Sequence, residues 1–317
     1  MKLWGDSMST NTLTVEKITT TPKQHILGLF AALVTVMIWS SYFLSLRIGV
    51  LTPLTLVELT FFRYAVPGLL LLPVFIKSLK EYAKVPWIYL CGIMIGSGLP
   101  FFLFSAYGMQ LTPVAYGSTL IPGTVPLFVT FIAVIMYKQP FPIFRQLGLI
   151  SICSGILAMI ISAQYHLDSK LLLGQGIFLV CAFLWAIFTI SIRQSGLSPL
   201  KVAALAALPN GVLITLWIAI TNPKLGYTAL PLSAVLGQFI VQGILVGIVS
   251  GVCFSTAIVR IGAEKTSAIG AATPAVATFF ATILLGEDIH MSLLIGMGFV
   301  IGGVFIASGV LHGERVS

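Results

Sequence analysis

One arginine, Arg63, lies near the middle of a long apolar run at 54–76. A charged side chain at that depth in a membrane helix is costly and marks a candidate functional site. Glu58 lies five residues earlier, which places it roughly 140° away around a helix, too far for an i,i+4 pair. Arg63 is therefore either a cavity residue that contacts an anionic group such as a carboxylate, or a structural arginine bound to backbone carbonyls. Glu58 is expected at the membrane interface, with a proton-coupling acid as the alternative.

Other polar and aromatic side chains lie at similar depth in other apolar runs. Asn210 is central in the run at 199–221, next to Gly211, and internal repetition places it opposite Arg63. We predict that Arg63 lines a small-molecule cavity together with Trp39, Tyr42, Tyr64, Tyr107, Trp185, Asn210 and Gln242. For each aromatic residue, the alternative is helix packing or anchoring at the membrane interface.

Three prolines inside apolar runs are candidate hinges. Pro122 and Pro126 lie one helical turn apart, and Pro274 lies near the middle of a later run. Proline lacks a backbone N–H and bends a helix, so such positions can expose carbonyl groups or serve as bending points. A static kink is the alternative interpretation.

Several kinds of chemistry have no candidate residues. The four histidines lie at the ends of apolar runs or between them, and the sequence contains no HExxH, no P-loop and no recognisable nucleophile triad. The four cysteines lie singly inside apolar runs, which predicts packing residues rather than disulfides or metal ligands. We therefore expect no cofactor, no metal site and no ATP-driven step by this chain alone.

The composition is typical of a membrane protein. Hydrophobic residues make up 58% of the chain and charged residues 8%, with a mean hydropathy of +1.06, whereas about 25% of an average soluble domain is charged. The formal net charge is +8. Because the basic residues lie between the apolar runs, they indicate orientation at a membrane surface rather than binding to nucleic acid.

Ten apolar runs are long enough to cross a bilayer, which takes roughly 20 residues each. Their approximate bounds are 26–46, 54–76, 86–107, 112–137, 144–163, 171–192, 199–221, 233–259, 264–286 and 289–311. With a cytoplasmic N-terminus, thirteen of the 17 Lys and Arg lie on the cytoplasmic side, and only Arg47, Lys170 and Lys224 lie on the other. This asymmetry predicts a multi-pass protein with both termini in the cytoplasm.

The sequence also repeats itself. At a shift of 146, Trp39, Arg47 and Pro53 meet residues of the same type, and at a shift of 148 Pro126 and Gly155 do so. Each copy holds five predicted helices. Because five is odd, the second copy enters the membrane inverted, and the halves are related by a pseudo-two-fold axis in the membrane plane. Such a pair suits alternating access.

Segments of both copies resemble the EamA-like branch of the drug/metabolite transporter superfamily. They are Trp39 in the first run, "FFRYAVPGLLLLP" with Arg63, "GMQLTPVAYGSTLIPGTVPLF", and "GAEKTSAIGAATPAVATFFATILLGE" followed by "GMGFVIGGVFIASG". The resemblance covers 26–311 and implies an all-α integral membrane fold of ten transmembrane helices in two five-helix inverted repeats. It also implies export or exchange of small metabolites such as amino acids. The first copy ends "MYKQP" where the second ends "LLGED", so the acidic end of the pattern is present only at Glu287.

The expected organisation is a polar cytoplasmic tail at 1–25, an EamA-like repeat at 26–163, a second repeat at 171–311 and a cytoplasmic tail at 312–317. We expect a multi-pass protein of the bacterial inner membrane, with Met1 or Met8 as the start, that is a monomer or homodimer.

Secondary transport of a small-molecule substrate is the favoured function, driven by a coupling ion or by the substrate's own gradient. An integral-membrane enzyme or lipid-handling protein is the alternative, for which only Glu287, Asp288 and His290 come close to the clustered groups required. An ion channel is disfavoured, because repeated polar pore-lining residues are lacking.

Overall fold

The computed structural model describes the backbone of residues 22–139, 141–165 and 168–308, and their side chains except at 162–165, 263 and 264. Helices and turns make up this described part, which contains no strand, so the predicted all-α class is confirmed. The predicted tails lie outside the described residues, except that 22–25 already belong to the first helix.

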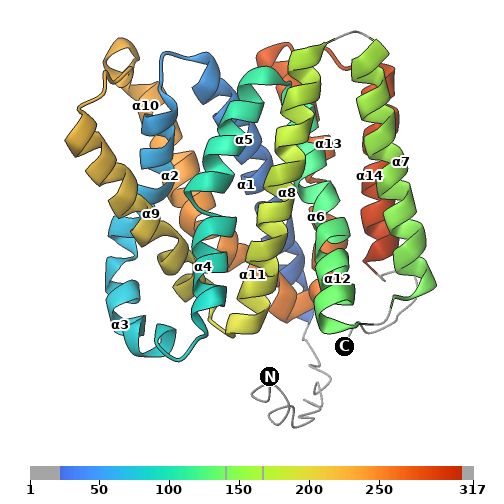
Figure 1. Cartoon of the computed structure of the whole chain (residues 1–317), viewed down its shortest axis with the longest axis horizontal. Coiled ribbons are helices and arrows are strands. Elements are labelled where there is room, and N and C mark those ends of the chain that lie inside the picture. Colours follow the sequence, from blue (N-terminus) through green and yellow to red (C-terminus); the bar gives the residue numbers. More distant parts are fainter. Residues whose placement is uncertain (1–21, 140, 166–167, 309–317) are drawn as a thin grey trace.

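Figure 1 shows the helices packed side by side, most of them along a common direction. In chain order they are α1 (Pro22–Leu51), α2 (Leu56–Leu70), α3 (Leu72–Tyr82), α4 (Trp87–Gly96), α5 (Leu99–Leu111), α6 (Val114–Tyr137), α7 (Ile143–Tyr165), α8 (Ser169–Ser195), α9 (Pro199–Thr221), η1 (Tyr227–Ala229), α10 (Leu232–Gln238), η2 (Phe239–Val249), α11 (Ser250–Ile261), α12 (Ala263–Gly270), α13 (Thr273–Leu285) and α14 (Met291–Ala307).

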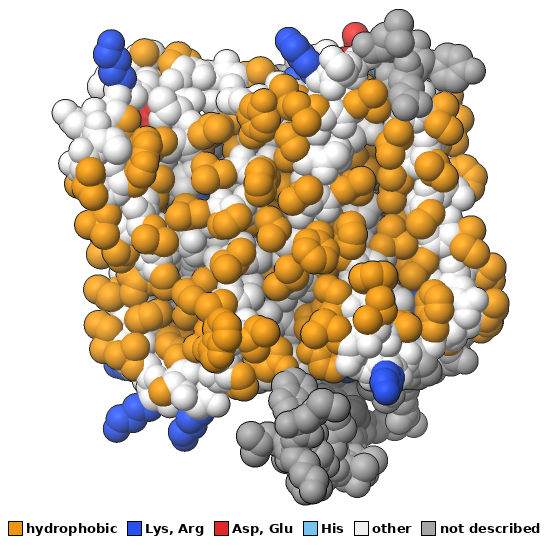
Figure 2. Space-filling view, viewed as in Figure 1, with side chains coloured by type: hydrophobic (Ala, Val, Ile, Leu, Met, Phe, Trp, Pro, Cys, Tyr) orange, Lys and Arg blue, Asp and Glu red, His pale blue; other side chains and the backbone are white. Residues whose placement is uncertain are grey.

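Within the described residues, eight helices or continuous helix pairs are long and apolar enough to cross a membrane. They are α1, α4 with α5, α6, α7, α8, α9, α10 through α11, and α12 with α13. The bent pair α2 and α3 makes a ninth if it is one span, and α14 is a shorter apolar helix. In Figure 2 hydrophobic side chains cover the middle of the molecule and lysines and arginines lie at its two ends. This distribution is that of a multi-pass membrane protein.

The predicted run at 54–76 is a bent pair of helices rather than one straight helix. Between Leu56–Leu70 and Leu72–Tyr82 the direction changes by 76°. Pro67 lies in the last turn of α2, and Pro73 lies in the first turn of α3. Proline disrupts a helix interior but fits a first turn, so this pair ends one helix and starts the next. The second helix continues to Tyr82, six residues beyond the predicted end.

Helices from the two halves of the sequence pack against one another. The contacts across the halves join α2 to α9, α1 to α11, and α8 to α4, α5 and α6. At one of them, a Cβ atom on Gly211 of α9 would lie 2.8 Å from the carbonyl oxygen of Tyr64 on α2. The two halves are therefore interleaved rather than separate domains.

The helices α7 and α14 form a closely packed pair at one side of the molecule (Figure 1). A Cβ atom on Gly155 would lie 2.5 Å from the carbonyl oxygen of Gly296, and one on Gly148 would lie 2.6 Å from that of Gly303. The two glycines of each helix are seven residues apart and so lie on the same helix face. Small residues at such positions let helix backbones approach closely.

Candidate functional site: a closed end and a polar centre

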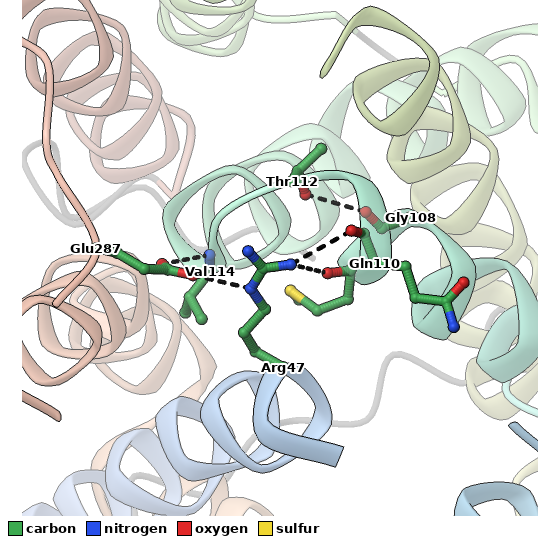
Figure 3. Close-up of polar contacts among 7 residues, drawn as sticks. Arg47, Gly108, Gln110, Thr112, Val114 and Glu287 are labelled. Atoms are coloured by element: carbon green, nitrogen blue, oxygen red, sulfur yellow. Dashed lines mark hydrogen bonds and ion pairs between the residues drawn. The ribbon is translucent and has the colours of Figure 1, made fainter. Parts of the chain in front are cut away.

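Arg47 and Glu287 form an ion pair at the end of the molecule where α1 finishes. The Arg47 Nε lies 2.9 Å from Glu287 Oε1, and only 15% and 11% of the two side chains are exposed. Arg47 Nη1 also donates to the carbonyl oxygen of Met109, near the end of α5, at 2.6 Å. Glu287 Oε2 accepts from the backbone N–H of Val114, the first residue of α6, at 2.8 Å. Figure 3 shows these contacts converging on the two side chains.

The local backbone explains why Glu287 reaches this position. Gly286 ends α13 in the left-handed region, with φ 65°, a conformation that glycine adopts at little cost and that closes a helix. The carboxylate that follows lies at the N-terminal end of α6, where backbone N–H groups favour negative charge. The pair thereby connects α1, the α5–α6 junction and the end of α13.

Arg63 lies half-buried on α2 with its guanidinium 5.4 Å from the centroid of the Tyr64 ring. It is also within electrostatic reach of Tyr42 on α1. Its buried Nε has no hydrogen-bond partner among the described residues, and no carboxylate there lies within ion-pair distance of it. The neighbouring Tyr42 hydroxyl lies 3.1 Å from the Ser105 hydroxyl of α5. Arg63 therefore presents a cation among tyrosines that no described acid neutralises.

Tyr64 and Asn210 both bind the break between α4 and α5. The Tyr64 hydroxyl lies 2.7 Å from the carbonyl oxygens of Ser97 and Gly98. Asn210 accepts from the N–H of Leu99 at 3.0 Å, and its amide nitrogen donates to two carbonyl oxygens, one of them that of Met94 at 3.0 Å. The helices α2 and α9 touch at this level, where a Cβ atom on Gly211 would lie 2.8 Å from the Tyr64 carbonyl oxygen. Asn210 satisfies backbone groups that the helix break leaves open.

Gln242 is fully buried in η2, an eleven-residue π-helix, a conformation that is rare at this length and often found at functional sites. Its Nε2 lies 3.3 Å from the Ser45 hydroxyl of α1, and its Oε1 has no partner among the described residues. Gln238, one turn earlier, donates to the Ser45 carbonyl oxygen at 2.7 Å and accepts from the Ser45 hydroxyl at 2.8 Å. These three residues form a polar contact between α1 and the helix that contains η2.

The remaining predicted aromatic residues lie apart from one another. Trp39 packs on Phe254 of α11, with ring centroids 5.1 Å apart. Trp185 packs on Phe101 of α5 at 4.9 Å. Tyr107 is 43% exposed on α5.

The candidate hinges occupy two kinds of position. Pro122 and Pro126 lie inside α6, which is one helix from Val114 to Tyr137. Pro274 lies in the first turn of α13, just after the break that separates it from α12. Only Pro274 therefore marks an interruption in a helix, and the sharpest bend, between α2 and α3, was not among the predicted hinges.

Glu58 is 5% exposed near the start of α2. Its carboxylate accepts from the N–H groups of Thr55 at 2.8 Å, Gly226 at 3.0 Å and Tyr227 at 2.8 Å. The residue therefore caps α2 and holds the segment after α9 against it, a position that agrees with the expected interface residue.

The family model of the EamA-like transporters matches the chain twice, over residues 26–161 and 172–309. This chain belongs to the EamA-like transporter family. The uncharacterized transporter YoaV of Bacillus subtilis (strain 168) is 24% identical over 291 residues, 88% of this chain and 96% of that protein. An uncharacterized transporter of Clostridium kluyveri is 28% identical over 139 residues, 44% of each chain. A solved crystal structure, 17% identical, covers 90% of this chain and 97% of its own with a TM-score of 0.58, which shows a shared fold.

In this EamA-like chain, the end opposite the ion pair is hollowed. A cavity of about 340 Å³ is lined by residues at the start of α9 and along α11: Ser198, Pro199, Leu200, Val252, Ser255, Thr256, Val259 and Arg260. A Cβ atom on Gly28 of α1 would lie 2.6 Å from Arg260 Cβ, and Gly28 lies 19 residues before Arg47, which is about 28 Å along a helix. A second cavity, of about 320 Å³, lies near Glu58 and Tyr227, at the end where α1 finishes. The two ends, called the Arg47 end and the Arg260 end from here on, therefore each have a cavity and an ion pair between helices. They differ in burial: the Arg47 and Glu287 side chains are 15% and 11% exposed, whereas Lys201 and Glu81 at the Arg260 end are 29% and 51% exposed.

The ion pair and the Ser45 contact were missed by reasoning from the sequence. Arg47 was placed just outside the first helix, at the membrane surface, whereas α1 continues to Leu51 and includes it. Glu287 was noted only as the acidic end of a family pattern. The repeat alignment of Arg47 with Arg193 was the available signal, because matched arginines near two helix ends suggest matched roles.

Proposed function

We propose that this EamA-like membrane transporter is a secondary transporter that exports or exchanges small metabolites such as amino acids. Alternating access takes place between two inverted five-helix repeats, 26–163 and 171–311. The bent pair α2 and α3 and the helix α14 each cross the membrane once, which with the eight longer spans makes ten crossings. Both termini lie in the cytoplasm of a bacterium whose inner membrane holds the chain, with the Arg260 end cytoplasmic.

The observation that carries this proposal is Arg63, whose buried Nε has no hydrogen-bond partner among the described residues, on a helix that packs against the other half of the chain. The burial of the ion pairs at the two ends supports it. At the Arg47 end, an ion pair with 2.9 Å separation ties α1 to α13, and further bonds tie both to the α5–α6 junction. At the Arg260 end, a cavity of about 340 Å³ lies between α9 and α11. A cavity of about 320 Å³ also lies at the Arg47 end, near Glu58, so the more buried ion pair, rather than the cavity volume, marks the Arg47 end as the more tightly closed one.

The substrate class follows from Arg63. This residue lies seven residues into α2, about 10 Å below its start. The buried Nε of its guanidinium has no hydrogen-bond partner among the described residues. The Tyr64 ring lies beside the guanidinium, and no described carboxylate lies within ion-pair distance of it. Leaving such a cation without a partner is costly, and a substrate carboxylate can accept two of its N–H groups at once. We infer that the substrate carries a carboxylate, as amino acids do.

The energy source belongs to the same proposal. A coupling ion, or the gradient of the substrate itself, drives the cycle. Dissipating the membrane potential and the pH gradient separately during uptake distinguishes the two. The chain acts as a monomer or homodimer in a lipid bilayer.

The described contacts favour no second function. The alternative enzyme or lipid-handling site needs Glu287, whose two carboxylate oxygens already accept bonds from Arg47 and Val114. Triple replacement of Glu287, Asp288 and His290 therefore disturbs closure of the Arg47 end rather than a reacting group.

Uptake by proteoliposomes tests the proposal. The purified chain is given a panel of radiolabelled amino acids and their decarboxylated amine analogues. We expect saturable uptake of at least one carboxylate-bearing compound and no uptake of its amine. Arg63→Ala should abolish this uptake with an unchanged melting temperature, whereas Arg145→Ala, on α7, should leave it intact. Loss of folding in Arg63→Ala would instead support the structural interpretation of this arginine, and no flux of any panel member would count against the proposal.

A further inference from the structure

The internal repeat gives the Arg47–Glu287 pair a counterpart. The shift of 146 aligns Arg47 with Arg193, and the shift of 148 aligns Glu287 with Gln139. Arg47 lies in the last turns of α1 and Arg193 in the last turn of α8. Glu287 follows Gly286, with φ 65°, at the end of α13.

Gln139 stands in the same backbone setting. It follows Lys138, with φ 51°, at the end of α6, so both residues come directly after a left-handed residue that closes a helix. The two pairs therefore occupy equivalent backbone positions at opposite ends of the molecule. Arg193 precedes α9, whose first residues line the cavity beside Arg260.

The two pairs are in different states. Arg47 is 15% exposed and bound to Glu287 and Met109. Arg193 is exposed, and among the described residues it has no hydrogen-bond or ion-pair partner, while Gln139 is half-buried. Equivalent residues of two inverted repeats that are joined at one end and apart at the other are what alternating access requires.

We propose that Arg193 and Gln139 form a second gate, which closes the Arg260 end when the Arg47–Glu287 pair opens. This inference rests on the proposed transport cycle. In the closed gate, the Arg193 guanidinium donates to Gln139 Oε1 and to carbonyl oxygens at the end of α11. Arg47 makes the corresponding bonds to Glu287 and to the end of α5.

The second gate is the weaker of the two. Gln139 offers a neutral acceptor where Glu287 offers a carboxylate, and a guanidinium binds a carboxylate more strongly than an amide oxygen because both partners are then charged. Closure also brings Arg193 toward Arg260, a like charge in the last turn of α11. The chain therefore rests with the Arg47 end closed, and Gln139 sets the balance between the two states.

Distances between spin labels at the Arg260 end test the gate. Labels are placed at Gln194 on α8 and Lys265 on α12, both exposed, in full-length chain reconstituted in liposomes after replacement of the four cysteines. Gln139→Glu should raise the ratio of short to long distances roughly five- to tenfold, because it converts the neutral acceptor into a charged one. Arg193→Gln should reduce the short-distance population. The double variant, Gln139→Glu with Arg193→Gln, should not show the increase expected for Gln139→Glu alone.

Gln146→Glu is the matched control, since it adds the same charge near the start of α7 and lies seven residues beyond Gln139. A change in Gln139→Glu no larger than that in this control, or one that persists in the double variant, overturns the second gate. If the distance between the labels at Gln194 and Lys265 has a single population, and that population is the same in the native chain and in Glu287→Gln, the transport cycle itself is contradicted. The two failures are therefore distinguishable.

Discussion

Replacing Glu287 by glutamine should open the Arg47 end. The substitution keeps the size and shape of the side chain, but it removes the charge and replaces one of the two acceptor oxygens by a donor NH2, so only one of the bonds from Arg47 and the Val114 N–H can be kept. The native carboxylate makes both contacts, at 2.9 Å and 2.8 Å, and is 11% exposed. The closed state alone contains this arrangement, so its loss shifts the equilibrium between the two states.

The size of the shift follows from these contacts. Hydrogen bonds to charged groups contribute about 1.5–3 kcal/mol, against about 0.5–1.5 kcal/mol for neutral ones. Because the pair is partly exposed, solvent screens it, and we take the lower part of the difference for the two bonds together, about 1.5 kcal/mol. That is roughly a tenfold change in the ratio of open to closed chains.

Spin labels at Gln110 on α5 and Met291 at the start of α14, both exposed, measure this ratio. We expect a longer distance to gain population about tenfold in Glu287→Gln relative to the native residue. Asp288→Asn is the control, because Asp288 is the adjacent, exposed acid and makes neither contact. Exchanging the charges, with Arg47→Glu and Glu287→Arg together, should restore part of the closed population. An unchanged distribution in Glu287→Gln would refute the reasoning.

Three further predictions concern stability, measured as melting in detergent. Asn210→Ala should destabilise the chain by about 2–4 kcal/mol, because it leaves buried backbone groups at the α4–α5 break unpaired; an unchanged melting temperature would remove the structural role. Lys138→Gly should stabilise the chain by about 0.5–1 kcal/mol, because φ is 51° there and glycine adopts this region at little cost. Asn222→Gly, at φ 42°, should stabilise the chain less, because asparagine tolerates this region. Equal stabilisation by the two variants would contradict the backbone argument. Gly155→Ala should destabilise the chain by about 1–3 kcal/mol, because its Cβ would lie 2.5 Å from the carbonyl oxygen of Gly296. Gly298→Ala should leave the stability unchanged, because open space surrounds that position. Similar effects of the two variants would contradict the close approach of α7 and α14.

Much of the fold was predictable because helix bounds depend on local signals. The run at 199–221 coincides with α9, which starts at a proline and ends before a left-handed asparagine. The predicted division between the runs at 86–107 and 112–137 is present, because Pro113 precedes the start of α6 and Thr112 is extended. The bend between α2 and α3 was not foreseen, since hydropathy continues across it.

The site was harder to predict, because its contacts join residues far apart in the sequence. Arg47 and Glu287 are separated by 240 positions, and neither spacing nor hydropathy relates them. Asn210 was selected as a substrate-binding residue, which stays a prediction. It is buried, and its partners at Leu99 and Met94 are backbone groups at a helix break that no side-chain pattern reveals. Arg63 was selected for its depth in an apolar run, and no described carboxylate lies within ion-pair distance of it. Its role in binding a substrate stays a prediction.

Alternating access is tested most directly by measuring both ends of the same chain in the same lipid. One sample carries labels at Gln110 and Met291, and the other carries labels at Gln194 and Lys265. We expect Glu287→Gln to increase the open population at the Arg47 end and to decrease it at the Arg260 end by the same fraction. Opening of the Arg47 end with no closure of the Arg260 end would leave a continuous path through the chain and would contradict a transporter that exposes one side at a time.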